Sequence, residues 1–93
     1  MSGWLQEQMK TPDFANAFAA AWIGETIATA MEDRMKELRM TKKQLAGRLR
    51  CSPANVSRWF TTPHAMSLST VARLFRVLEL DVAVVQRVPG GIQ

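Results

Sequence analysis

Basic side chains crowd into the middle of this 93-residue chain, where their chemistry suits the binding of phosphate groups. The stretch between Leu38 and Leu78 has no acidic residue and eight basic ones: Arg39, Lys42, Lys43, Arg48, Arg50, Arg58, Arg73 and Arg76. The flanking segments hold more acids than bases, so the net charge of +4 comes entirely from the middle. Such a segment can neutralise the backbone phosphates of a nucleic acid, although a solvated face of a basic protein has the same composition.

Other reactive side chains form no recognisable catalytic or metal-binding set. Cys51 is the single cysteine and His64 the single histidine, and neither has partners at metal-ligand spacing. We therefore expect no catalytic residue, no metal and no cofactor. One cysteine excludes an internal disulfide, and no apolar run approaches the roughly 18 residues of a membrane-spanning helix. A cytoplasmic protein without membrane contact is the resulting expectation.

Two short helices are predicted to hold most of the basic residues. Thr41 and Gln44 form a capping-box pattern, so a helix should run from Lys42 to about Leu49. After a turn of about three residues, Ser52 as N-cap and Pro53 at the first helical position should start a second helix. The predicted inner faces are Leu45, Ala46 and Leu49 in the first helix and Val56, Trp59 and Phe60 in the second.

Further helices are expected on both sides of this pair. Thr11, Pro12 and Asp13 have the pattern of a helix start, with a cap, a proline and an acid in the first turn. Gly24 is the position where this helix is most easily bent or broken, so one bent helix and two short ones both fit. Ser67 should cap a last helix that closes the core. The expected apolar faces are Phe14, Phe18, Ala21, Trp22, Ile27, Met31, Met35 and Leu38 in the N-terminal part, and Leu68, Val71, Leu74, Phe75 and Leu78 in the last helix.

The run MTKKQLAGRLRCSPANVSRW, from Met40 to Trp59, has a distinctive spacing of polar and apolar residues, and MSLSTVARL follows from Met66 to Leu74. Together they resemble the lambda-repressor-like (Xre-type) helix-turn-helix family over roughly residues 27–80. The family usually has glycine between its two helices, whereas this chain has Arg50 and Cys51. The turn is therefore expected to be strained or differently built.

The resemblance implies a compact all-α fold of four to five helices that binds duplex DNA. In that family the first short helix braces across the phosphate backbone, and the second, here Ser52 to Phe60, enters the major groove. Arg58 would read a base, because a guanidinium can fork onto guanine O6 and N7, whereas Pro53 and Ala54 could only touch a thymine methyl. Lys43, Arg48 and Arg50 are further phosphate candidates. The predicted DNA-binding set is Thr41, Lys42, Lys43, Ser52, Pro53, Ala54, Asn55, Ser57 and Arg58.

The chain divides on this basis into an N-terminal helical extension (1–26), a helix-turn-helix domain (27–80) and a C-terminal strand or tail (81–93). The last segment is rich in β-branched residues and has no strand to pair with, so its mate would be the same strand of a second copy. A homodimer would also present two recognition helices to half-sites about one helical turn apart. The N-terminal helix with Phe14, Phe18 and Trp22 is the competing dimer surface.

Three functions are compatible with these features. The first is a sequence-specific, duplex-DNA-binding transcriptional regulator, expected to be a dimeric repressor that occludes a promoter. The N-terminal extension also resembles that of Xre-type antitoxins, which implies a protein that neutralises a toxin and autoregulates its operon. An exposed apolar face on residues 11–24 would favour this alternative. The third is an adaptor domain that keeps the fold without binding DNA.

Overall fold

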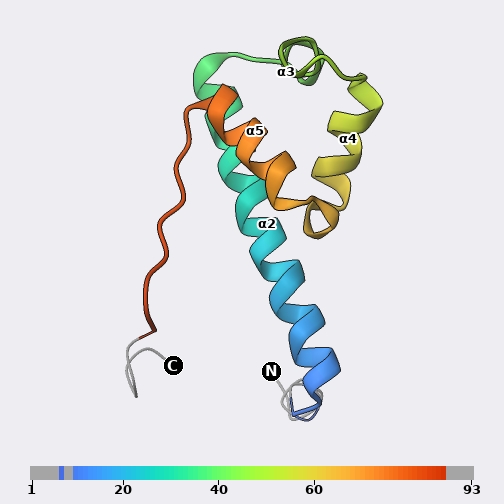
Figure 1. The fold of residues 1–93 in the computed structure, drawn as a ribbon, viewed down its shortest axis with the longest axis vertical. Coiled ribbons are helices and arrows are strands. Elements are labelled where there is room, and N and C mark those ends of the chain that lie inside the picture. The colour runs from blue at the N-terminus through green and yellow to red at the C-terminus, as the bar shows by residue number, and fades with distance from the viewer. Residues whose placement is uncertain (1–6, 8–9, 88–93) are drawn as a thin grey trace.

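The computed structural model describes Glu7 and residues 10–87, so residues 1–6, 8–9 and 88–93 of the two predicted terminal segments lie outside the described part (Figure 1). Within that part the chain folds into helices and no strand. The all-α prediction is confirmed. The elements are α2 (Pro12–Leu38), α3 (Lys42–Leu49), α4 (Pro53–Thr61), the 3-10 turn η1 (Pro63–Ala65) and α5 (Leu68–Leu78).

The longest helix, α2, runs without a break from Pro12 to Leu38, so the alternative of two short helices is wrong. Pro12 occupies the start of the helix and Asp13 its first turn, as predicted, whereas the Thr11 side chain makes no capping hydrogen bond. The predicted boundary between residues 26 and 27 falls inside this helix. The division into an extension and a domain stays a prediction.

Gly24 marks the point where α2 meets η1. It is buried, and a Cβ at this position would lie 2.7 Å from the backbone nitrogen of His64 and 3.0 Å from its Cα. Backbone cannot yield as the end of a flexible side chain can, so this close approach requires glycine. Gly24 therefore lets the segment after α4 pack against α2 and does not interrupt the helix.

Gly24→Ala is expected to lower the free energy of unfolding by about 1 kcal/mol, because overpacking costs roughly 1–3 kcal/mol and outweighs the gain in helix propensity. Gly47→Ala is the matched control, since a Cβ there would meet nothing within 4 Å. Helix propensity alone then acts, and stability should rise by about 0.5–1 kcal/mol. Urea unfolding followed by circular dichroism measures both changes. Equal stabilisation by the two substitutions would mean that the contact between α2 and η1 is loose.

The core lies where all four helices of the described part converge. Its fully buried side chains come from every one of them: Met31, Leu45, Val56, Leu74 and Leu78. Trp59 and Phe60 are half-buried and pack against this cluster. The predicted inner faces of α3 and α4 are thus confirmed. Burial of each large side chain contributes roughly 1.5–3 kcal/mol, which holds α3 and α4 in one fixed arrangement.

Several residues predicted to face the core lie instead on the surface. Leu68, the first residue of α5, is 87% exposed. Phe18 and Trp22 of α2 are 44% and 65% exposed, because the turn of about 100° per residue carries them to a different side of the helix from Met31 and Met35. The apolar stripe of α2 is therefore not continuous. Leu38, at the end of α2, is also exposed.

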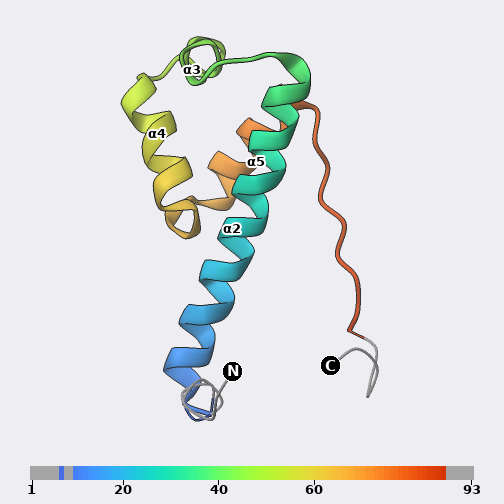
Figure 2. The ribbon, with the colours of Figure 1, turned by 180° about the vertical axis from the view of Figure 1, so that it is seen from behind.

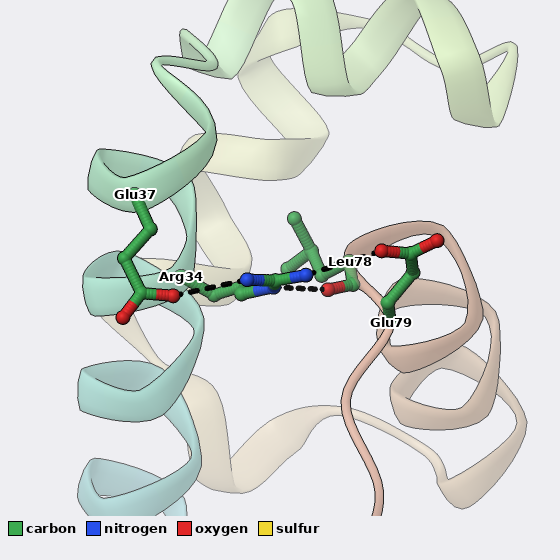
Figure 3. A network of polar contacts seen from close by, with 4 residues as sticks. All are labelled: Arg34, Glu37, Leu78 and Glu79. Carbon is green, nitrogen blue, oxygen red and sulfur yellow. Dashed lines mark hydrogen bonds and ion pairs between the residues drawn. The ribbon is translucent and has the colours of Figure 1, made fainter.

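A polar cluster ties the end of α5 to α2 (Figure 3). Nε of Arg34 donates to the carbonyl oxygen of Leu78 at 2.8 Å, while its terminal nitrogens lie 3.0 Å from Glu37 Oε1 and 3.1 Å from Glu79 Oε1. One guanidinium thus satisfies a carbonyl at the end of α5 and joins two carboxylates. The C-terminal end of α5 is thus held against α2.

Residues 81–87 follow without helix or strand and are exposed throughout. In Figures 1 and 2 they extend from the end of α5 toward the end of the molecule where α2 begins, separated from α2. The C-terminal strand predicted as one possibility is therefore not formed within the single described chain.

Candidate nucleic-acid interface

The turn between α3 and α4 is built around a non-glycine residue in the left-handed conformation. Arg50 has φ 57° and ψ 47°, and its N–H donates to Gly47 O at 3.2 Å. The N–H of Cys51 donates to Ala46 O at 3.0 Å, which completes a Schellman motif. Arg50 thus takes the conformation that glycine adopts more easily, at a cost of roughly 1–2 kcal/mol. The predicted strain at this turn is real, and the usual geometry survives.

The first turn of α3 keeps both predicted capping contacts. Thr41 Oγ1 accepts from the N–H of Gln44 at 3.1 Å, and Gln44 Oε1 accepts from the N–H of Thr41 at 2.8 Å. Helix geometry leaves the N–H groups of Lys42 and Lys43 without intrahelical acceptors. The first turn of α3 therefore has two free backbone donors and two exposed lysines, a combination suited to a phosphate.

Helix α4 has one side in the core and the other in solvent. Its start is fixed by Ser52, whose Oγ accepts from the N–H of Asn55 at 3.2 Å, so that this hydroxyl is already engaged. Asn55 is half-buried, and Val56 is fully buried. The predicted groove-facing residues all lie on the exposed side: Pro53, Ala54, Ser57 and Arg58.

Thr61 shares this exposed side and was not among the predicted residues. Its Oγ1 donates to the carbonyl oxygen of Ser57 at 2.8 Å, four residues earlier. The sequence did contain a signal for Thr61, which follows Ser57 by four residues, because residues i and i+4 lie on one helix face. The hydroxyl keeps its acceptor lone pairs free toward solvent.

The exposed cations of this region keep their charges free of carboxylates. The ion pairs within the described part of the chain join Lys10 to Glu7 and Arg34 to Glu37 and Glu79. None of the following cations forms an ion pair with a described residue: Arg39, Lys42, Lys43, Arg48, Arg50 and Arg58. Their full charges are therefore available to an anionic partner.

Two of the eight central cations also have contacts within the protein. The Nζ atom of Lys42 lies 4.9 Å from the centroid of the Phe60 ring, a cation–π contact that joins the first turn of α3 to the last turn of α4. Nη2 of Arg73 donates to Leu49 O at 2.9 Å and so places a positive charge at the C-terminal end of α3. Arg73 therefore supports the position of α3. The Lys42 contact ties the basic start of α3 to the last turn of α4.

The described residues offer little for other chemistry. They contain no group of three His, Cys, Asp or Glu residues placed to hold a metal ion. None of the helices they form is long and apolar enough to cross a membrane. The distinctive features of the described surface are thus the exposed side of α4 and the exposed cations that form no ion pair.

Comparison with known families agrees with this geometry. A family model described as a helix-turn-helix domain matches residues 22–88. The match includes most of α2, all of α3, α4 and α5, and the segment that follows. No curated protein and no solved structure matches the chain.

Proposed function

Because this chain belongs to the helix-turn-helix domain family, we propose that it binds duplex DNA through the exposed side of α4 and regulates transcription as a dimeric repressor. The main support is the exposed side of α4 with Arg58, together with cations at the start of α3 that form no ion pair with a described residue. In this proposal α4 enters the major groove, while α3 rests on the phosphate backbone.

The side chains on the exposed side of α4 predict how the affinity for DNA is divided between base contacts and phosphate contacts. Pro53 and Ala54 offer only apolar contact, so Ser57 and Arg58 are the polar groups proposed to meet base edges. Lys42, Lys43, Arg48 and Arg50 would contact phosphates, which position the protein without selecting a sequence. Most of the affinity should therefore be electrostatic, with DNA shape adding to the selectivity.

Selection from a random duplex library, followed by fluorescence anisotropy at two salt concentrations, tests the proposal. We expect a palindromic site, as a two-fold dimer requires. With three or four phosphate contacts per protomer, raising the salt from about 50 to about 200 mM should weaken binding about 10³- to 10⁴-fold. Absence of an enriched site, or binding indifferent to salt, would contradict this function and favour an adaptor domain.

A second candidate function rests on the N-terminal half of α2. Phe18, Trp22 and Ile23 are 44%, 65% and 52% exposed, an apolar surface of the kind that binds other proteins. This exposure favours a protein partner, as in an antitoxin that neutralises a toxin and autoregulates its operon. Co-purification with the product of an adjacent gene, abolished by Trp22→Ala while DNA affinity is kept, would support this function. A complex that survives the substitution would contradict it.

A further inference from the structure

Two apolar hollows lie along α5. The first is lined by residues of α2, η1 and α5 that include Ile23, Ile27, Leu68 and Val71, and the second, between α5 and residues 80–82, by residues that include Leu68, Val71, Phe75 and Val82. Leu68 and Val71 line both hollows, so the hollows adjoin. Ile23 is 52% exposed and Leu68 is 87% exposed. An exposed apolar surface of this kind on a small protein is typical of a site that binds another protein.

The segment 81–87 begins at the second hollow, which Asp81 and Val82 help to line, and it has unused backbone groups. Val82, Val84 and Val85 are 67%, 93% and 86% exposed. The N–H of Leu80 bonds to Phe75 O, and beyond it residues 81–87 make no backbone hydrogen bond with a described residue. Exposed β-branched residues with free N–H and C=O groups form a template for a strand from another chain.

We propose that a second copy of this chain is that partner, and that the two segments 81–87 pair antiparallel about a two-fold axis at Val84. The ribbon so formed begins at the hollow between α5 and residues 80–82 of each copy. This inference rests on the homodimer of the proposed function and adds the surface and the register.

The charges of the segment fix the register. Antiparallel pairing centred on Val84 sets Asp81 opposite Arg87 of the second copy, twice by symmetry, and Val84 opposite itself. Neither Asp81 nor Arg87 forms an ion pair with a described residue of its own chain. Opposite charges across an antiparallel pair contribute roughly 0.2–1 kcal/mol each. The segment is thus complementary to itself in this register.

Neighbouring registers lose this match. A centre at Val85 sets Arg87 opposite Ala83 and Asp81 opposite position 89, a proline that has no N–H to donate. A centre at Ala83 sets Arg87 opposite Glu79, which has φ 58° and is bonded to Arg34. Neither shift yields a charge pair between strand residues that are both free.

The aromatic face of α2 is less suited to pairing with itself. The hollow beside Trp22 is lined by two carboxylates, Glu25 and Asp33, and residues 11–33 contain no basic side chain. Two such faces in contact would bring carboxylates together without compensation, which is unfavourable. This face therefore suits a basic partner of another kind, whereas the segment 81–87 suits a second copy.

Sedimentation equilibrium on the full chain tests the register through charge reversal. Asp81→Arg and Arg87→Asp should each weaken dimerisation about tenfold or more, because each sets like charges opposite one another twice. An equimolar mixture of the two variants should dimerise like the unmodified protein, since both cross-strand pairs are then of opposite charge. The double variant with both changes should do the same. Glu25→Gln, on the aromatic face, is the control and should leave the dimer intact.

The outcomes separate this inference from the proposed DNA binding. Anisotropy on a duplex with a single half-site reports the contact of α4 with DNA whatever the oligomeric state. A monomeric unmodified protein, or a mixture of single variants that does not recover, would overturn the register. A dimer that Trp22→Ala abolishes but charge reversal leaves unaffected would overturn the inference and move the interface to the aromatic face. Circular dichroism checks that each exposed substitution leaves the fold intact.

Discussion

Leu45→Ala is expected to lower the free energy of unfolding by about 3 kcal/mol. Leu45 of α3 is fully buried in the core shared by all four described helices, next to an Ala46 that is 1% exposed. Truncation loses the transfer free energy of the removed carbons and leaves a cavity that close-packed neighbours fill only in part, which together cost roughly 2–5 kcal/mol. The total stability of a small domain is about 5–15 kcal/mol, so the loss is a large share of it.

Leu68→Ala provides the matched control, because it removes the same carbons at a position that is 87% exposed. Its effect should stay within about 0.5 kcal/mol. Urea unfolding should be measured at protein concentrations low enough that self-association adds nothing to stability. A loss at Leu45 no larger than the loss at Leu68 would mean that α3 is not held by the core. The proposed bracing of α3 on DNA would then lack a rigid support.

Helix starts could be predicted from the sequence because capping is a local interaction. The hydroxyls of Thr41, Ser52 and Ser67 each accept from the N–H three residues later. A few adjacent residues contain everything that such a contact needs. The bounds of α3 and the three-residue turn followed directly from these signals. Thr11 is the exception, since its side chain makes no cap contact.

Burial depends on distant residues, and there the sequence was insufficient. Gly24 looked like a weak point in a helix, yet its role comes from the backbone of His64, forty positions away. Phe18 and Trp22 have helical spacing with respect to one another, but spacing does not tell which of two apolar faces meets the core. Leu68 fits the apolar period of α5 and still lies on the surface, since it is the first residue of that helix.

The candidate site, too, could be predicted from the sequence only in part. The exposed side of α4 could be predicted, because Ser57 and Arg58 are placed by the helical period relative to the buried Val56. The sequence could not show, however, that one of the basic side chains supports the fold. Arg73 bonds to the carbonyl of Leu49, 24 residues away, and a run of basic residues alone does not distinguish such a support from a free charge.

Arg58→Ala should weaken binding to the selected DNA site by about 1–3 kcal/mol and relax the preference at one base position. Arg58 is exposed on α4 and forms no ion pair with a described residue, so its loss should leave the fold unchanged.

Lys42→Ala removes an equal charge at the start of α3. It should weaken all duplexes alike and reduce the slope of affinity against salt by about one for each phosphate that is no longer neutralised. An unaltered slope for this variant would remove Lys42 from the phosphate-binding residues.

Arg58→Lys separates the role of charge from that of shape at this position. Lysine keeps the positive charge but lacks the planar fork that bonds to O6 and N7 of guanine together. The salt dependence should therefore match that of the unmodified protein, while the preference at the affected base falls. Repeating the library selection with this variant measures the preference directly. If lysine keeps the full preference, Arg58 acts as a charge near phosphate, and selectivity must come from Ser57 and from the shape of the DNA.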